Sequence, residues 1–228
     1  MAMARSIVIS GGTGGLGSAV TTAMLDDGWE VVVPYVEARE LERVSAHPNL
    51  TLIEADLFDE HAAAEVVAAA GGRLGALVNL VGGFAAGGRV HETPIEEFER
   101  QFRLNLRPAY LLCQAALPRM LEAGDGSIVC VSTRAALRPF SGAAGYISSK
   151  AAVLAFVDAL AAEYTRDGLR INAILPSVID TPANRANEPD ADHSRWVTPA
   201  QIANVIRFLC SPDAGPISGA HVPVYGRA

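Results

Sequence analysis

The chain has 228 residues and a formal net charge of −7, and half of its residues are hydrophobic. This length suits one domain with a sizeable core, and the acidic balance argues against nucleic acid as a partner. The three cysteines, Cys113, Cys130 and Cys210, stand apart in apolar contexts, so we expect reduced core residues, no metal site and a cytoplasmic protein. No apolar run reaches the length of a membrane span and no signal peptide is evident, so we expect no membrane partner.

The first predicted strand, residues 6–9, runs into the glycine-rich segment SGGTGGLG at residues 10–17, and a helix is predicted over residues 16–25. Two glycine patterns overlap here, G-x-G-x-x-G at Gly12, Gly14 and Gly17 and G-x-x-x-G-x-G at Gly11, Gly15 and Gly17. Glycines let the backbone come close to a ligand, and a helix N-terminus attracts a pyrophosphate. The segment therefore predicts a dinucleotide site, with a glycine-rich turn that binds no ligand as the alternative.

The second predicted strand covers residues 30–35, with Pro34 near its end because proline lacks a donor for the strand ladder. Tyr35 then lies at the carboxyl edge of the sheet, where the adenosine ribose rests in a doubly wound fold. An acid there typically serves NAD, whereas Arg or Lys nearby serves NADP, and Glu37 and Arg39 give a mixed signal. We favour NAD and leave NADP open.

A short helix over residues 39–46 and a third strand over residues 50–55 come next. Asp56 follows that strand and has two interpretations. Its carboxylate could accept a hydrogen bond from the adenine amino group, or it could cap the next predicted helix, residues 60–70.

The fourth predicted strand, residues 75–80, runs into VGGFAAGG at residues 81–88. So many glycines after a strand indicate close approach of the backbone, by topology to the cofactor's ribose and nicotinamide. Phe84 either faces the substrate or is a structural loop aromatic. A capping box is predicted at residues 93–96 (TPIE), opening a helix that carries Asn105 in an apolar stretch. A buried Asn must find partners, and a capping or kinking role is its alternative.

The fifth predicted strand, residues 127–132, is followed by Thr133 and then by a long helix over residues 143–165 that is apolar nearly all round. Such a helix is buried on two sides, one against the sheet and the other against a second subunit. We therefore expect a homodimer or homotetramer assembled through the helices at residues 108–123 and 143–165.

The remaining elements are a sixth strand over residues 169–175, a polar substrate flap over residues 183–196, a helix opened by the capping box at Thr198, and a last strand over residues 221–225. Seven strands that alternate with helices predict an α/β fold, with a doubly wound parallel seven-stranded sheet and helices on both faces. One alternation throughout predicts a single domain over residues 1–228.

Tyr146 and Lys150 lie four residues apart and therefore share one face of the long helix. A free Tyr has a pKa of about 10, and a neighbouring ammonium lowers that pKa. A Tyr tuned in this way exchanges a proton with an alcohol or a developing alkoxide, and Lys150 could also reach ribose hydroxyls. An ordinary surface Tyr/Lys pair is the alternative.

Taken together, SGGTGGLG, LVNLVGG, Asn105, VST, YISSK and PSVIDTP resemble the short-chain dehydrogenase/reductase family, in family order and over essentially the whole chain. The resemblance implies a single Rossmann domain that transfers hydride between NAD(P) and a carbonyl or alcohol of a small-molecule substrate. It makes Tyr146 the general acid/base, Lys150 its helper and ribose ligand, and Asn105 the support of a water relay to Lys150.

The resemblance and the topology together give the expected contacts. Those with the cofactor are Gly11, Thr13, Gly15, Leu16, Gly17, Tyr35, Asp56, Leu57, Asn79, Val81, Gly82, Tyr146, Lys150, Pro176, Ile179 and Thr181. Those with the substrate are Thr133, Phe84 and Trp196. Thr133 stands where the family has its catalytic Ser; its hydroxyl can donate the same hydrogen bond, whereas Ser132 points the other way along the strand.

The glycine-rich segment 81–88 and the short flap also resemble dihydropteridine reductase, which implies NADH and a quinonoid pterin substrate. Trp196 and Phe84 could then offer flat surfaces for a ring, with Trp196 as a mere anchor of the flap as the alternative. Thr133, Leu80 and Ser177 differ from the residues that the family usually has at these positions. These differences motivate a further alternative, a dinucleotide-binding protein without catalysis.

Overall fold

The structure is a computed structural model that describes residues 5–227. Its centre is one parallel sheet of seven strands in the order β3-β2-β1-β4-β5-β6-β7. The strands are β1 (Arg5–Ser10), β2 (Glu30–Tyr35), β3 (Leu50–Glu54), β4 (Arg73–Asn79), β5 (Gly126–Val131), β6 (Leu169–Pro176) and β7 (His221–Val224). The predicted α/β class and the seven-stranded parallel sheet are confirmed.

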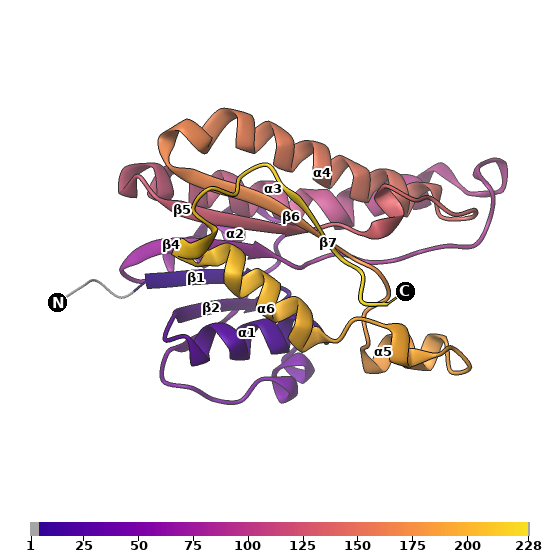
Figure 1. Cartoon of the computed structure of the whole chain (residues 1–228), viewed down its shortest axis with the longest axis horizontal. Helices are drawn as coiled ribbons and strands as arrows, with labels where there is room; N and C mark the ends of the chain where they lie inside the picture. The colour runs from indigo at the N-terminus through magenta and orange to yellow at the C-terminus, as the bar shows by residue number, and fades with distance from the viewer. Residues whose placement is uncertain (1–4, 228) are drawn as a thin grey trace.

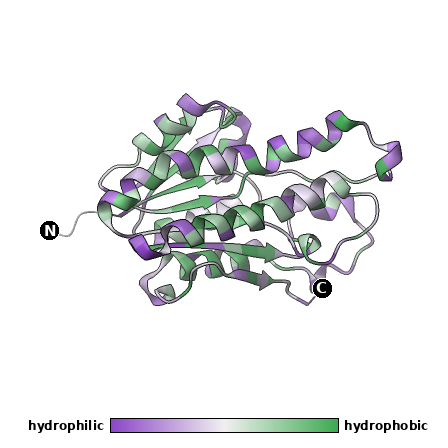
Figure 2. Cartoon of the chain, turned by 90° about the horizontal axis from the view of Figure 1, so that it is seen from above, coloured by the Kyte–Doolittle hydropathy of each residue, from purple (hydrophilic) through white to green (hydrophobic). Residues whose placement is uncertain are grey.

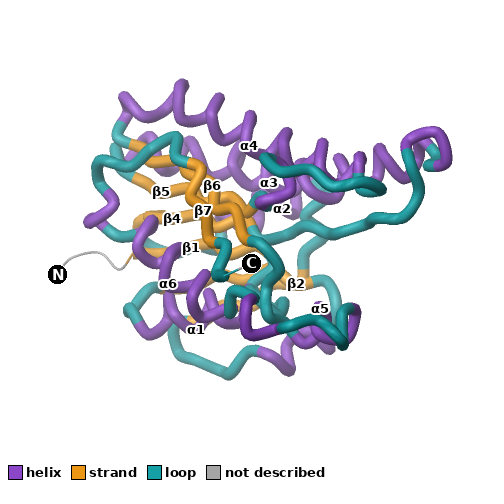
Figure 3. Tube along the Cα trace, turned by 45° about the vertical axis from the view of Figure 1, so that its right-hand side comes forward, coloured by secondary structure: helices purple, strands orange, loops and turns teal. Residues whose placement is uncertain are grey.

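Helices cover both faces of the sheet (Figure 1). One face carries α1 (Gly17–Asp26) and α6 (Pro199–Cys210), which pack on each other, and the other carries α2 (Glu60–Ala68), α3 (Ile95–Ala123) and α4 (Ala144–Tyr164). The short helix α5 (Pro182–Asn187) lies outside the sheet, beyond the N-terminal end of α6 (Figures 1 and 3). The polar flap predicted over residues 183–196 therefore contains helical turns.

The strands alternate their side chains between two apolar cores. Ile7 and Ile9 of β1 are fully buried against α1 and α6, whereas Val8 is fully buried on the opposite face. This period of two is what a β-strand imposes, and here both faces are apolar because both are covered by helices. Figure 2 shows the result, with hydrophobic strands inside and hydrophilic residues gathered toward the helix ends and loops.

The chain reverses its direction of winding between β1 and β4, which are neighbours in the sheet. The chain leaves β1 toward α1 on one face and leaves β4 toward α3 on the other, so the loops that follow these strands diverge. Such a switch point opens a crevice at the carboxyl edge of a doubly wound sheet. The glycine-rich loops at residues 11–16 and 80–88 both lie there.

Some local predictions were wrong. The helix after residue 93 begins at Ile95 without a side-chain cap, because the Thr93 hydroxyl instead donates to the carbonyls of Gly88 and Arg89. Of the two interpretations of Asp56, the cap of α2 does not hold: Asp59 caps this helix, since its carboxylate accepts from the amide of Ala62 at 2.8 Å. The predicted short helix 39–46 is a 3₁₀ helix, η1 (Ala38–Arg43).

The second capping box is confirmed. The amide of Gln201 donates to the Thr198 hydroxyl (3.3 Å), and the amide of Thr198 donates to the Gln201 side chain (3.0 Å). Pro34 lies one residue before the end of β2, past the last residue of β2 that pairs with β1. Its missing amide therefore breaks no hydrogen bond between these two inner strands.

The segment Ala144–Asp167 is long and apolar enough to cross a membrane by length and composition. In the fold, its residues Val153 and Val157 are buried, and the helix packs on β6 and on α3. Its apolar character is therefore explained by packing inside a helix–sheet–helix structure.

Candidate active site

The glycine-rich loop between β1 and α1 leaves no room for side chains at its turn. Gly11 has a φ of +70°, and a Cβ on Gly17 would lie 1.9 Å from the Gly11 carbonyl oxygen. The amide of Gly14 closes the turn by donating to the same oxygen at 3.0 Å. Helix α1 then begins at Gly17 with no side-chain cap. The Ser18 amide donates to the Gly14 carbonyl at 2.9 Å, and the other amides of this first turn are open to an anion. This cradle fits a pyrophosphate.

The loop after β6 closes the cradle from the other side. A Cβ on Gly15 would lie 3.2 Å from the side chain of Thr181. Thr181 caps α5 through its hydroxyl, which accepts from the amide of Asn184 at 3.3 Å, and Ile179 forms a bridge with Val197. The structure thus brings the predicted residues of the first and last loops together at one edge of the sheet.

Glu40 also lies at this edge, although the sequence analysis did not identify it. The Thr13 hydroxyl, buried in the glycine-rich loop, donates to the Glu40 carboxylate at 2.9 Å. Glu40 belongs to η1, which follows the strand end at Tyr35. No local pattern identifies it, because the contact depends on how η1 folds over a loop that precedes it by 27 residues.

The predicted adenine contacts occupy the ends of β2 and β3. Tyr35 is half-buried at the end of β2, and Leu57 is buried with 6% exposure. Asp56 is exposed, and its carboxylate accepts from the amide of Phe58 at 3.0 Å. Because Asp59 caps α2, the remaining prediction for Asp56 is that its carboxylate accepts a hydrogen bond from the adenine amino group.

Asn79 points into the protein between β4, β5 and α3. Its amide nitrogen lies 3.6 Å from the Cys113 sulfur and 3.5 Å from the Cys130 sulfur. Its Oδ1 is buried and has no hydrogen-bond partner within residues 5–227. All three cysteines are free and buried.

Gly82 marks the closest approach of the second glycine-rich loop to the long helix. A Cβ there would lie 2.6 Å from Oδ1 of Asn105 and 2.8 Å from Nζ of Lys150. Val81 just before it is partly buried against the α2–α3–α4 core. The loop therefore needs glycine at residue 82 to pass between these two polar groups.

Asn105 binds the loop to α4. Its amide donates to the Gly83 carbonyl (3.1 Å) and to the Ser149 hydroxyl (3.0 Å), and its oxygen accepts from the Gly83 amide (2.9 Å). The Ser149 hydroxyl in turn donates to the carbonyl of Tyr146 at 2.8 Å. Asn105 thus has the partners that burial demands, and Ser149 is a positioning residue that the sequence analysis missed.

Lys150 is 6% exposed, and its Nζ donates to the Val131 carbonyl at 3.0 Å. Burial lowers the pKa of Lys150 to about 8, and the neighbouring Cys130 acts in the opposite direction. Ser132 turns away from the cavity, because its hydroxyl donates to the carbonyl of Lys150 at 2.8 Å. The expected orientation of Ser132 is therefore confirmed.

Tyr146 differs from expectation in one respect. Burial raises its pKa above the ordinary value, and a hydrogen bond with Thr133 only partly offsets this. The expected lowering by Lys150 is absent because the Lys150 ammonium is directed at the Val131 carbonyl. Desolvation of the phenolate thus outweighs the hydrogen bond with Thr133.

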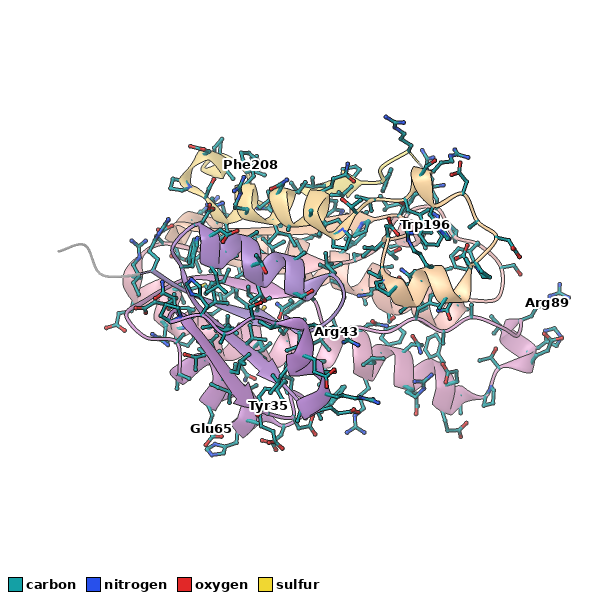
Figure 4. The ribbon with its side chains drawn as sticks, turned by 90° about the horizontal axis from the view of Figure 1, so that it is seen from below. Tyr35, Arg43, Glu65, Arg89, Trp196 and Phe208 are labelled. Carbon is teal, nitrogen blue, oxygen red and sulfur yellow. The ribbon has the colours of Figure 1, made fainter. Side chains whose placement is uncertain are left out.

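A cavity of about 1170 Å³ opens in front of Tyr146 and Thr133. Phe84 lines it and meets the Tyr146 ring edge-on, with ring centroids 5.0 Å apart. Trp196 lines it from the flap, is only 9% exposed and packs on His193, so it serves both as wall and as anchor. Figure 4 shows Trp196 within the flap and Arg89 at the far tip of the loop between β4 and α3.

Comparison with known proteins places these features in a family. Residues 11–226 match the family model described as enoyl-(acyl carrier protein) reductase. The 2-(R)-hydroxypropyl-CoM dehydrogenase of Xanthobacter autotrophicus is 33% identical over 98% of both chains. The 4-formylbenzenesulfonate dehydrogenase of Comamonas testosteroni is 31% identical over 96% of this chain and 95% of its own. A 3-oxoacyl-[acyl-carrier protein] reductase from Brucella melitensis with bound NAD superimposes with a TM-score of 0.85 at 25% identity, over 97% of this chain and 90% of the other.

Proposed function

The chain belongs to the short-chain dehydrogenase/reductase family as an NAD(P)-dependent oxidoreductase, and we propose that Tyr146 is the proton donor and acceptor of its hydride-transfer reaction. One observation carries the proposal. Tyr146 and Thr133 line one cavity at the carboxyl edge of the sheet, beside the glycine-rich loops.

The chemistry follows from what each side chain can do in the cavity. A nicotinamide coenzyme bound beside Tyr146 would supply a hydride to a carbonyl or imine carbon, or accept one from an alcohol. Thr133 donates a hydrogen bond to the substrate oxygen, which fixes the reacting carbon and polarises the bond. Tyr146 gives its phenolic proton to the oxygen as the new C–H bond forms, and takes it back in the reverse direction.

Lys150 acts from behind Tyr146. Its Nζ lies against Gly82, and the protons that it does not donate to the Val131 carbonyl would be available to a ribose hydroxyl of the coenzyme. Asn105 and Ser149 fix the first turns of α4 against the loop at Gly83, which keeps Tyr146 and Lys150 in register. Preorganisation of this kind avoids reorganisation during the reaction.

A coenzyme-linked assay tests the proposal. We expect oxidation of NADH or NADPH with at least one member of a panel of small aldehydes, ketones, 3-oxoacyl thioesters and quinonoid dihydropterin. The relatives named for a hydroxypropyl compound and for 4-formylbenzenesulfonate favour the small alcohols and aldehydes of this panel. Coenzyme binding without oxidation across the panel would favour a non-catalytic role instead.

We further propose that NAD is preferred over NADP. The glycine-rich loop has no basic side chain, Arg39 is paired with Glu37, and the Glu40 carboxylate accepts from Thr13 at the ribose edge. A 2′-phosphate placed there meets the Glu40 carboxylate, which repels it.

The Glu40→Gln variant tests this preference. In the unaltered protein we expect the dissociation constant of NADPH to exceed that of NADH by about tenfold or more, an energy of about 1.4 kcal/mol. In Glu40→Gln, the NADPH constant should fall while the NADH constant changes little, as measured by coenzyme fluorescence titration. Tighter binding of NADPH by the unaltered protein would refute the preference.

We also propose a homo-oligomer through the outer faces of α3 and α4. Tyr110 on α3 and Phe156 on α4 form an aromatic pair, with ring centroids 5.7 Å apart, and Tyr110 is 51% exposed. An exposed aromatic side chain that packs on a half-buried one, on neighbouring long helices, is typical of an interface centre.

Tyr110→Glu is expected to weaken that assembly. The dissociation constant of the oligomer should rise about 30-fold, which corresponds to the loss of an aromatic contact worth about 2 kcal/mol. Analytical ultracentrifugation measures this shift, with Leu52→Glu on the distant strand β3 as the control. A monomer in the unaltered protein, or an unchanged assembly in Tyr110→Glu, would exclude this interface.

The cytoplasm is the location we propose for this protein. Its three cysteines are buried and free, as in proteins of a reducing compartment. Fractionation of the source cells tests this assignment.

A further inference from the structure

Arginine side chains line the active-site cavity but have no part in the hydride-transfer step. Arg134 directly follows Thr133, Arg138 lies four residues further on, and Arg195 comes from the flap. The amide of Arg138 donates to the carbonyl of Arg134 at 2.9 Å, so these two residues lie one helical turn apart on one side of their segment. They therefore present two guanidinium groups to the cavity that Thr133 and Tyr146 line.

These two guanidinium groups are available to a ligand. Within residues 5–227, the one interaction that either guanidinium makes is the contact of Arg134 with the ring of Tyr225, at 5.6 Å. Arg195, in contrast, uses its Nε to donate to the carbonyl of Arg227 at 3.2 Å. A guanidinium has five donors in a planar fork that matches carboxylate, sulfonate and phosphate oxygens.

The acidic side chains of the cavity do not neutralise this charge. Glu188 and Asp192 line it from the flap. The Asp192 carboxylate already accepts from the amide and the hydroxyl of Ser194, at 3.1 and 2.6 Å, and these bonds hold its pKa below the usual range. The described lining therefore carries the three guanidinium groups of Arg134, Arg138 and Arg195 against the two carboxylates of Glu188 and Asp192.

Aromatic side chains form a large part of the remaining cavity wall. Phe84 and Phe140 form one side, with ring centroids 6.4 Å apart, and Trp196 forms another. Aromatic side chains of this kind suit a planar or compact apolar body.

We infer that the substrate is an anion, with a carboxylate, sulfonate or phosphate group that Arg134 and Arg138 bind while Thr133 and Tyr146 hold its carbonyl. The inference rests on the proposed function, because it names the substrate class of the same cavity. The anionic group lies on the arginine wall, and the apolar body lies between the aromatic side chains. The chain's net charge of −7 makes this cationic wall a local exception, which selects for anions inside the cavity.

The same arginines have one competing role. They could pair with Glu188 and hold the flap closed over any substrate, charged or neutral. The two roles give opposite predictions for Glu188→Gln. Removal of a repelling carboxylate should strengthen the preference for an anion, whereas loss of a flap contact should impair anionic and neutral substrates alike.

The test uses matched aldehydes with the full chain and NADH. The charged probes are 3- and 4-formylbenzoate, and the neutral probes are their methyl esters. We expect kcat/KM for the better acid to exceed that of its ester by about tenfold or more, the effect of one charge-assisted hydrogen bond. In the double variant Arg134→Gln/Arg138→Gln this ratio should fall to near one, mainly through a higher KM for the acid.

Arg166→Gln is the control, since Arg166 is exposed in η4 (Thr165–Asp167), at the opposite end of the sheet. It should keep the ratio of the unaltered enzyme, and Glu188→Gln should raise it. A ratio near one in the unaltered enzyme, a ratio unchanged in the double variant, or a loss with both probes in Glu188→Gln would overturn the inference.

Binding without turnover separates this inference from the proposed function. Calorimetry of benzoate and methyl benzoate with the NADH-bound protein should show tighter binding of benzoate, and this preference should be lost in the double variant. If no probe oxidises NADH but benzoate still binds preferentially, the proposed function fails and the anion site stands. Equal binding of benzoate and its ester overturns the anion site whatever the activity.

Discussion

The Tyr146→Phe variant is expected to lose about 10²- to 10⁴-fold in kcat, the usual contribution of a positioned general acid or base. Phe keeps the ring and removes only the hydroxyl, so the edge-on contact with Phe84 remains. Lys150 keeps its bond to the Val131 carbonyl, and the coenzyme's dissociation constant should change by no more than about twofold. Steady-state assays and fluorescence titration measure the two quantities.

Tyr164→Phe provides the matched control, because Tyr164 ends the same helix at the far side from the cavity. It should leave kcat unchanged. Full activity in Tyr146→Phe would remove the phenol from the mechanism, and a loss of coenzyme binding equal to the loss of kcat would assign Tyr146 a binding role.

Gly17→Ala is expected to destabilise the protein by about 3 kcal/mol or more, because its Cβ would lie 1.9 Å from the Gly11 carbonyl oxygen. For a chain of this length, that lowers the Tm by roughly 6 to 12 °C. The backbone of Gly12 lies 2.7 Å from the same Cβ, so the turn cannot yield without moving the cradle. Coenzyme affinity should therefore fall together with the Tm, which calorimetry and titration measure.

Gly14→Ala is the control in the same loop. Its Cβ would meet the Gly11 carbonyl oxygen at 3.3 Å, with no positive φ to strain the residue. We expect a loss below about 1 kcal/mol. Equal stability losses in the two variants would show that the close approach of Gly17 to the Gly11 carbonyl oxygen is not the reason why the loop needs glycine.

Much of the fold was predictable because its signals are local. The inner strands of this sheet are short apolar runs covered on both faces, and strands and helices alternate along most of the chain, so the seven-stranded parallel sheet could be predicted from the sequence. The glycine-rich loop after β1 was predictable for the same reason, since Gly11 and Gly17 need a conformation or a space that only glycine provides.

The wrong predictions concern hydrogen bonds whose partners depend on the tertiary structure and not on the local sequence alone. Thr93 and Asp56 both fit capping patterns, yet Thr93 bonds to the carbonyls of the preceding turn and Asp59 caps α2. Glu40 was missed because its contact with Thr13 depends on the path of η1. In each case several polar groups could make the hydrogen bond, and the tertiary structure determines which of them does.

The pKa of Tyr146 is a further example. The spacing of Tyr146 and Lys150 is a sequence feature, but the depth at which they lie is not. Burial raises one pKa and lowers the other, and the direction of the ammonium depends on the Val131 carbonyl of a separate strand. A sequence shows which groups share a helix face, whereas their solvation comes from the packing of the whole fold.

A crystal structure with bound NADH tests the central claim most directly. It should show the pyrophosphate against residues 11–17 and the nicotinamide C4 within about 4 Å of the Tyr146 hydroxyl, the range of a reacting pair. A nicotinamide ring outside the cavity of Tyr146 and Thr133, or a pyrophosphate bound away from the glycine-rich loop, would contradict the proposed mechanism.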